Sequence, residues 1–285
     1  MSETAQPKDL KKMIAERKMT VVVGSGISRA TTQDAPLWGE LIESGIQRCV
    51  DVGETQAWCD AARSMLKVGS LDMLLMAAEL VHGKLNENGG GEFAAWLREC
   101  FESLEPQDRT VIEALATLEL PLVTTNYDDL IEKVTGLKYV TWQDRRLVAR
   151  EVRRDDRRVL HLHGHWEKPE SVVLGLRTYI GVSEDSHTQA VMKALGVGTS
   201  FLFVGCGEEG LSDPNWGRFL EWLKQYDIEG GHEHRHYRLV LEQDRFKPDG
   251  RLFPLVYGTD YSELAGFLSS LAPDDATAAM EHATT

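Results

Sequence analysis

The chain has 285 residues, of which 42% are hydrophobic, 27% charged and 8% aromatic, and this composition excludes wholesale disorder. The formal net charge of −14 repels nucleic-acid phosphates and anionic lipid headgroups, so neither is expected as the main partner. The four cysteines form no Cys-x-x-Cys pair, which argues against a zinc ribbon and a disulfide framework. No apolar leader or membrane-length apolar stretch occurs, so we expect a cytoplasmic protein.

The first predicted elements are a helix and a strand. Residues from about Lys8 to Arg17 have helical composition, and Met19–Val23 is a β-branched run typical of a buried parallel strand. Five segments with helical patterns then run from Leu37 to about Leu118. They are LWGELIESGIQRCV, AWCDAARSML, LDMLLMAAELVHGKL, EFAAWLRECFESL and RTVIEALATL.

Strands and helices are expected to alternate along the rest of the chain. The predicted strands lie in PLVTTN, RRVLHLHGHW, VVLG, SFLFVGCG, HYRLVLEQD and LFPLVYG. This alternation predicts an α/β fold, a Rossmann-like doubly wound parallel sheet with a helical insertion at about residues 39–118. We expect one domain over residues 1–271 and a flexible tail over 272–285, which is small, polar and without apolar period.

Seven arginines between Arg145 and Arg158 form the one concentrated basic segment. Acidic residues are interleaved with them, and Asp155-Asp156 suits a turn, so the pattern favours an exposed β-ribbon over a phosphate track. A docking surface for a partner protein is the alternative.

Gly24-Ser25-Gly26-Ile27-Ser28 directly follows the first predicted strand. Glycines there permit positive φ and a close approach of phosphate to backbone N–H groups. The segment lacks the Gly-Lys-Ser/Thr ending of a P-loop, and Arg29 stands where a dinucleotide fingerprint has its third glycine. A plain tight turn is the alternative interpretation.

The order of the later motifs is more specific than this glycine turn. After the turn come Ala35-Pro36-Leu37-Trp38, Thr124-Thr125-Asn126-Tyr127-Asp128, His161-Leu162-His163-Gly164, Phe203-Val204-Gly205-Cys206-Gly207 and Asp213-Pro214. The series resembles the sirtuin superfamily, and in particular the prokaryotic sirtuin-like effectors of anti-phage defence. With a closing segment Tyr257–Leu264, the resemblance runs from about Val21 to Leu268.

One departure from this resemblance is informative. Protein-deacylating sirtuins carry four zinc-binding cysteines after the His-Gly pair and a strand that holds the acyl-lysine peptide. Here only residues 165–171 separate Gly164 from Val172, which leaves no room for a zinc module. The resemblance therefore implies an NAD pocket without a platform for a protein substrate, as in an NAD glycohydrolase that releases nicotinamide and ADP-ribose and needs no metal.

Two residues are the candidate catalytic groups. Nicotinamide leaves NAD as a neutral pyridine, so a pair of carboxylates is unnecessary, but water and ribose must be oriented. Asn126 suits that orienting role, and an asparagine at this position is essential in the resembled family. His163 is the candidate general base, with a pKa expected near about 6.5. Taken singly, Asn126 could instead be a helix cap and His163 a satisfied strand-end histidine.

The resemblance also implies a set of NAD-binding residues. Trp38 would wall the nicotinamide site but is equally suited to helix packing, and Asp128 is as well suited to a structural role as to a ribose contact. Asp129 with Glu132 fits a capping box. The candidate NAD-binding residues are Gly24, Ser25, Gly26, Ile27, Ser28, Trp38, Asp128, Gly205 and Asp213.

Two sets of alternating histidines could suggest a metal site, namely His161, His163 and His165, and then His232, His234 and His236. Neither is expected to bind one, because the second set has no nearby Asp or Cys and the first includes the candidate base.

The resemblance implies a role in abortive infection by depletion of NAD. Since unrestrained hydrolysis would harm the host, we expect control by homo-oligomer assembly or by a partner such as a HerA-type ATPase or a short Argonaute. Two alternatives stay open: an NAD-dependent protein deacylase, and a non-catalytic subunit that senses NAD or ADP-ribose.

Overall fold

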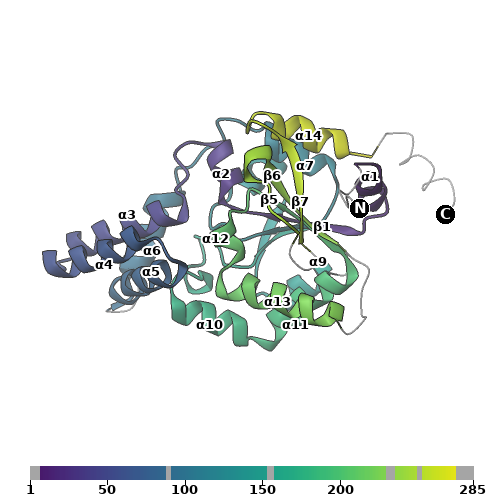
Figure 1. The fold of residues 1–285 in the computed structure, drawn as a ribbon. Helices are drawn as coiled ribbons and strands as arrows, with labels where there is room; N and C mark the ends of the chain where they lie inside the picture. Colours follow the sequence, from purple (N-terminus) through teal and green to yellow (C-terminus); the bar gives the residue numbers. More distant parts are fainter. Residues whose placement is uncertain (1–6, 88–90, 153–156, 229–234, 249–251, 274–285) are drawn as a thin grey trace.

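The computed structural model describes residues 7–87, 91–152, 157–228, 235–248 and 252–273 (Figure 1). Within these ranges seven parallel strands form one sheet in the order β3-β4-β2-β1-β5-β6-β7. The strands are β1 (Met19–Val23), β2 (Leu122–Thr124), β3 (Lys138–Thr141), β4 (Arg158–His161), β5 (Ser200–Val204), β6 (His236–Leu241) and β7 (Leu252–Gly258).

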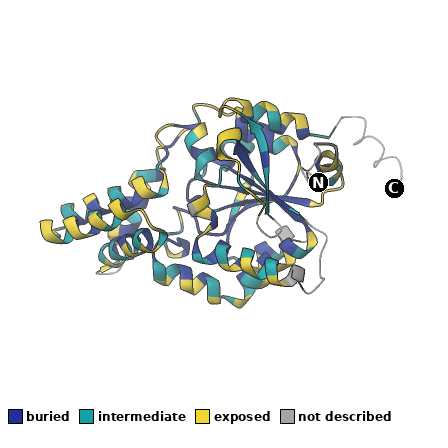
Figure 2. Ribbon diagram, viewed as in Figure 1, coloured by how far each residue is buried: buried dark blue, intermediate teal, exposed yellow. Residues whose placement is uncertain are grey.

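The two central strands are buried on both faces. β1 pairs with β5 from Met19 opposite Ser200 to Val23 opposite Val204, and every residue of both strands is buried. Because side chains alternate across a strand, Val21 and Val23 enter one hydrophobic core and Val22 enters the other. Figure 2 shows these strands dark blue throughout. A continuous β-branched run is therefore what this position requires.

Helices cover both faces of the sheet, as a doubly wound fold requires (Figure 1). One face carries α1, α7, α8 and α14, and the other carries α9, α11 and α13. Their bounds are α1 (Pro7–Ala15), α7 (Thr110–Thr117), α8 (Leu130–Thr135), α9 (Arg145–Val152), α11 (Ser186–Gly198), α13 (Pro214–Ile228) and α14 (Glu263–Leu271). The predicted α/β Rossmann-like class is confirmed.

Four of the helices between β1 and β2 project to one side of the sheet (Figure 1). They are α3 (Trp38–Asp51), α4 (Gln56–Val68), α5 (Leu71–Leu85) and α6 (Gly91–Phe101), which follow the short α2 (Ser25–Thr31). Their interior includes Trp96 and Val81, and a Cβ added at Gly45 would lie 2.5 Å from Val81 Cγ1. The helical pattern predicted for Leu37 to Leu118 is confirmed.

The remaining elements lie in the connections between β4 and β7. They are α10 (Leu176–Glu184), α12 (Glu208–Leu211) and two short 3₁₀ helices, η2 (Pro169–Ser171) and η3 (Glu242–Asp244). No helix in the described part of the chain is long and apolar enough to cross a membrane.

One predicted strand is wrong and one strand was missed. Residues 172–175 (VVLG) are buried but lie outside the sheet, and Val173 N–H donates to His163 O at 2.8 Å. A short apolar run predicts burial without specifying which backbone groups it will pair with. The missed strand is β3, whose first two residues are not buried because it forms an edge of the sheet.

The prediction of a β-ribbon at the arginine segment is also wrong where the structure describes it. Arg145–Val152 form the helix α9, which packs on α11 through Val148. Leu147 and Val148 give this helix an apolar side, which the prediction missed because it considered only the charged residues. Residues 153–156, which include the expected turn, lie outside the described ranges, as do the tail residues from 274 onward.

The glycine turn after β1 is a close contact between two pieces of backbone. Gly24 has φ −108°, and neither it nor Gly26 has positive φ, contrary to the expectation for this turn. Their small size is needed because Cβ atoms at Gly24 and Gly26 would lie 2.5 and 2.9 Å from Gly205 O. Gly26 N–H donates to that carbonyl at 3.0 Å, so this N–H is already occupied. The ends of β1 and β5 are thereby joined.

We predict that Gly205→Ala lowers the free energy of unfolding by about 2–4 kcal/mol. Gly205 has φ +66°, and its added Cβ would lie 2.7 Å from Ile27 Cγ1 and 2.8 Å from Ile27 N. Urea denaturation measures the change. Gly207→Ala is the matched control, since a Cβ there meets nothing within 4 Å, and equal stability of the two variants would contradict this account.

Candidate functional site

A cavity of about 1000 Å³ opens at the carboxyl ends of the central strands, where a doubly wound sheet places its ligand. The structure brings both candidate catalytic residues, Asn126 and His163, to its wall. Of the candidate NAD-binding residues, all but Ser28 line it as well: Gly24, Ser25, Gly26, Ile27, Trp38, Asp128, Gly205 and Asp213.

The side chain of Asn126 has a defined orientation. Its Nδ2 donates to Gly24 O at 3.1 Å and to Ser28 Oγ at 2.8 Å. Because a carbonyl oxygen can only accept, the NH₂ group must face Gly24, which settles which way the amide points. Oδ1 accepts no hydrogen bond from the described residues. Asn126 therefore offers the cavity an acceptor, not a donor.

Ser28 and Asp128 hold this orientation. Ser28 Oγ accepts from Asn126 Nδ2 and donates to Asp128 Oδ2 at 2.6 Å, while Asp128 Oδ1 accepts from Leu130 N–H at 3.2 Å. Burial raises the pKa of Asp128, an effect that the Ser28 and Leu130 hydrogen bonds oppose. The hydroxyl of Ser28, a candidate NAD-binding residue, thus donates its hydrogen bond to Asp128. Asp128 combines the structural role with a place on the cavity wall.

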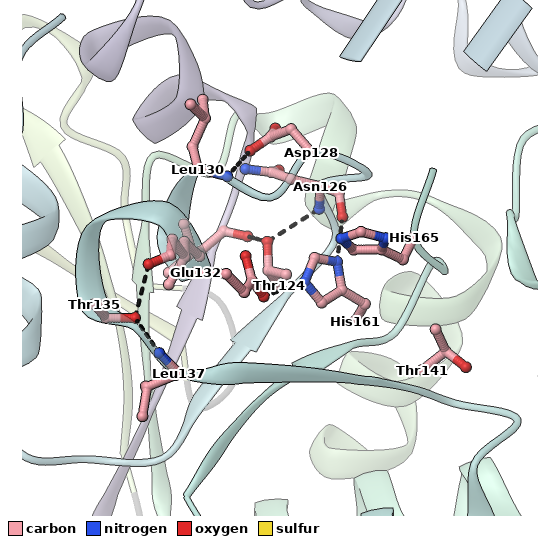
Figure 3. Close-up of polar contacts among 12 residues, drawn as sticks. Thr124, Asn126, Asp128, Leu130, Glu132, Thr135, Leu137, Thr141, His161 and His165 are labelled. Atoms are coloured by element: carbon pink, nitrogen blue, oxygen red, sulfur yellow. Dashed lines mark hydrogen bonds and ion pairs between the residues drawn. The ribbon is translucent and has the colours of Figure 1, made fainter. Parts of the chain in front are cut away.

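The predicted capping box at the start of α8 is wrong. Asp129 occupies the N-cap position without a side-chain cap hydrogen bond, and its carboxylate lies 3.2 Å from Lys133 Nζ. Glu132 does not reach back to the helix start, because its Oε1 lies 2.8 Å from His161 Nε2 (Figure 3). The Glu132 carboxylate, which the local pattern assigned to the helix cap, instead contacts His161 of β4.

His163 faces a buried carboxylate. Its Nε2 lies 3.7 Å from Asp213 Oδ2, and each residue is only 3% exposed. Asp213 Oδ1 accepts from the N–H groups of Asn215 and Trp216 at 2.8 and 2.9 Å, where α13 begins. That capping role leaves Oδ2 as the oxygen directed to His163. His163 Nε2 has no hydrogen-bond partner among the described residues.

Burial changes the acid–base properties of this pair. It lowers the pKa of His163 to about 3 and raises the pKa of Asp213 to about 7. The expected pKa near 6.5 for His163 is therefore wrong, because the sequence does not show that the ring is desolvated. At neutral pH the imidazole is neutral, and a proton placed on it would be stabilised by the Asp213 carboxylate.

The alternating histidines have separate structural environments. His165 stacks on Tyr139 with ring centroids 3.8 Å apart, and His236 Nδ1 accepts from Phe201 N–H at 2.9 Å. His232 and His234 lie outside the described residues. No group of three or more His, Cys, Asp or Glu side chains in the described ranges could hold a metal ion.

Other residues on the cavity wall were not singled out from the sequence. Tyr179 of α10 is buried with its ring 5.2 Å from that of His163, edge to face. Arg29 pairs with Glu40, and Arg238 Nε donates to Cys206 O at 2.9 Å. Its position directly after the glycine turn could have identified Arg29 as a cavity residue from the sequence. Nothing local marks Tyr179, since tertiary packing alone brings α10 to the site.

Trp38 lies both on the cavity wall and in the helix packing. It begins α3, lines the cavity and also packs against two hydrophobic clusters, one of which includes Leu75 and Tyr179. The two interpretations of this residue are thus compatible.

The comparison with known families agrees with this site. Residues 121–253, just under half of the chain, match the SIR2-like domain family. The matched stretch runs from the start of β2 to the second residue of β7 and includes Asn126, His163 and Asp213. This match supports a sirtuin-like family and, broadly, NAD-related chemistry for the protein.

Proposed function

We propose that the protein hydrolyses NAD to nicotinamide and ADP-ribose. The observation that carries the proposal is the orientation of Asn126: Nδ2 is bound to Gly24 O and Ser28 Oγ, while the side-chain oxygen Oδ1 has no hydrogen-bond partner among the described residues. A fixed acceptor at the cavity wall suits a reaction that must orient a water molecule and a ribose hydroxyl.

The proposed reaction needs little acid catalysis. The bond between nicotinamide and ribose breaks with its electron pair passing to the cationic ring nitrogen, which becomes neutral. Asn126 Oδ1 accepts a hydrogen bond from water or from a ribose hydroxyl and so holds it in place. Water adds to the ribose carbon and loses one proton. The balanced products are nicotinamide, ADP-ribose and that proton.

His163 and Asp213 are proposed to receive the proton together. A neutral imidazole with its pKa lowered to about 3 is a weak base by itself. The Asp213 carboxylate, with Oδ2 3.7 Å from Nε2, would stabilise the imidazolium as it forms. Asp213, first assigned to NAD binding, is in this proposal part of the proton-accepting pair.

The compact segment after His163 supports water as the acceptor of the ribosyl group. A Cβ at Gly164 would lie 2.2 Å from Ser171 O, and Ser171 Oγ accepts from His165 N–H at 3.1 Å. The turn thus closes on η2 within a few residues, where a deacylase would carry its zinc module. This favours hydrolysis over deacylation.

We further propose that hydrolysis serves anti-phage defence by depletion of NAD, with assembly or a partner protein controlling it. The alternative of a non-catalytic sensor for NAD or ADP-ribose is less well supported, because such a sensor would have no need for the buried pair of His163 and Asp213. The assay below separates hydrolysis from both alternatives, since neither a sensor nor a deacylase without an acyl-lysine peptide releases nicotinamide from NAD.

We predict that Asn126→Ala and His163→Ala each reduce nicotinamide release by about 100-fold or more, through loss of water orientation or proton acceptance. Release is quantified by chromatography with purified protein and NAD, alone and with candidate partners. Asn86→Ala and His187→Ala are matched controls, because neither residue lines the cavity. Full activity in both site variants would refute the mechanism.

We also predict that the rate of hydrolysis rises as pH rises through about 7. Asp213 must be ionised to stabilise the imidazolium, and burial raises its pKa to about 7. Asp213→Asn keeps the Oδ1 acceptor for α13 but removes the charge, so it should lower the rate about 10-fold to 100-fold and flatten this limb. If the rate of Asp213→Asn still rose with pH near 6.5, His163 would instead be acting as a base without help from Asp213.

A further inference from the structure

The backbone carbonyl of Asn126 is held by a buried histidine that lines no part of the cavity. His161 ends β4, is 0% exposed, and its Nδ1 lies 2.9 Å from Asn126 O (Figure 3). Because a carbonyl oxygen only accepts, Nδ1 must carry a proton and donate it. The parallel register makes this contact possible, since Thr124 lies opposite His161 two residues before Asn126.

The other ring nitrogen of His161 is bound as well. Nε2 lies 2.8 Å from Glu132 Oε1, and the Glu132 side chain is only 11% exposed. Burial by itself would lower the pKa of His161, but the Glu132 carboxylate and the Asn126 carbonyl outweigh this and raise it. Glu132 therefore fixes the ring orientation and keeps the Nδ1 proton directed at Asn126.

Two aromatic rings pack beside His161. The rings of Tyr139 and His165 pack edge to face with it, at centroid distances of 6.0 and 4.9 Å. Burial lowers the pKa of His165 to about 2, so this neighbour is neutral. The direction of the His161 ring is therefore set by its two hydrogen bonds, to Asn126 O and to Glu132 Oε1.

These contacts complete the immobilisation of Asn126. Its N–H donates to Thr124 Oγ1 at 3.0 Å, its Nδ2 to Gly24 O and Ser28 Oγ, and its carbonyl accepts from His161. Every polar group except Oδ1 has a partner. The position of Asn126 Oδ1 therefore depends on contacts that run from Asn126 through His161 to Glu132 in α8.

We propose that His161 and Glu132 are positioning residues, which set the place of Asn126 Oδ1 through the backbone carbonyl. The proposal rests on the proposed function for the role of Asn126 in NAD hydrolysis. Neither residue lines the cavity, so both act through Asn126 and not on NAD. Hydrogen-bonded partners behind a functional residue typically change activity by about 10-fold to 100-fold when removed.

The test compares His161→Leu and Glu132→Ala with two controls. In His161→Leu and Glu132→Ala we expect kcat for NAD hydrolysis to fall about 10-fold or more, while KM changes less than about 2-fold. Glu132→Gln should stay within about 3-fold of the unsubstituted protein, since its amide can donate to His161 Nε2 while the proton on Nδ1 still donates to Asn126 O.

His165→Leu is the control for a merely structural effect. It removes a buried ring that packs beside His161 but forms no hydrogen bond with Asn126, His161 or Glu132, so it should lower the unfolding temperature without lowering kcat. The proposal is overturned if His161→Leu loses no more kcat than His165→Leu. It is equally overturned if Glu132→Gln loses as much as Glu132→Ala.

A readout without turnover separates this proposal from the proposed function. The side-chain amide signals of Asn126, assigned in ¹⁵N NMR spectra with Asn126→Asp, should shift in His161→Leu and Glu132→Ala but not in His165→Leu. If the unsubstituted protein releases no nicotinamide while these shifts occur, the proposed function fails and the positioning stands. Unshifted signals in His161→Leu overturn the positioning, whatever the activity.

Discussion

The site depends on one constraint, the attachment of Asn126 Nδ2 to Gly24 O. This hydrogen bond joins the end of β2 to the end of β1 and directs the amide oxygen away from the backbone. A second backbone contact, Gly26 N–H to Gly205 O, joins β1 to β5 on the other side. Since both contacts occur at the carboxyl ends of parallel strands, they tie the cavity wall directly to the sheet where such a fold places its ligand.

Burial gives the polar groups of this wall their chemical character. In water a histidine and an aspartate would differ little from their ordinary pKa values, but desolvation moves those of His163 and Asp213 to about 3 and about 7. The same desolvation acts on His161, where the Glu132 carboxylate overcomes it. The pKa values of two histidines two residues apart therefore shift in opposite directions, because burial alone acts on His163 whereas His161 is hydrogen-bonded to a carboxylate.

Of the helices between β1 and β2, α3 contributes its first residues to the cavity wall. Trp38 at the start of α3 lines the cavity, and Glu40 pairs with Arg29 of α2. The rest of this helical group packs around Trp96 and Val81 beside the sheet. Its outer surfaces are exposed, as the yellow segments of α3 and α4 in Figure 2 show.

The sequence alone determined the parallel α/β class and placed Asn126 and His163 near one another, because apolar runs and strand-end polar residues are local patterns that constrain any parallel sheet. It misplaced a strand at VVLG and assigned Glu132 to a capping box, because local spacing does not say which backbone or side chain is the partner. Only the tertiary structure decided the direction of the Asn126 amide, the approach of Asp213 to His163, and the hold of His161 on Asn126. Each of these depends on desolvation and on contacts between elements distant in the chain, which no local pattern contains.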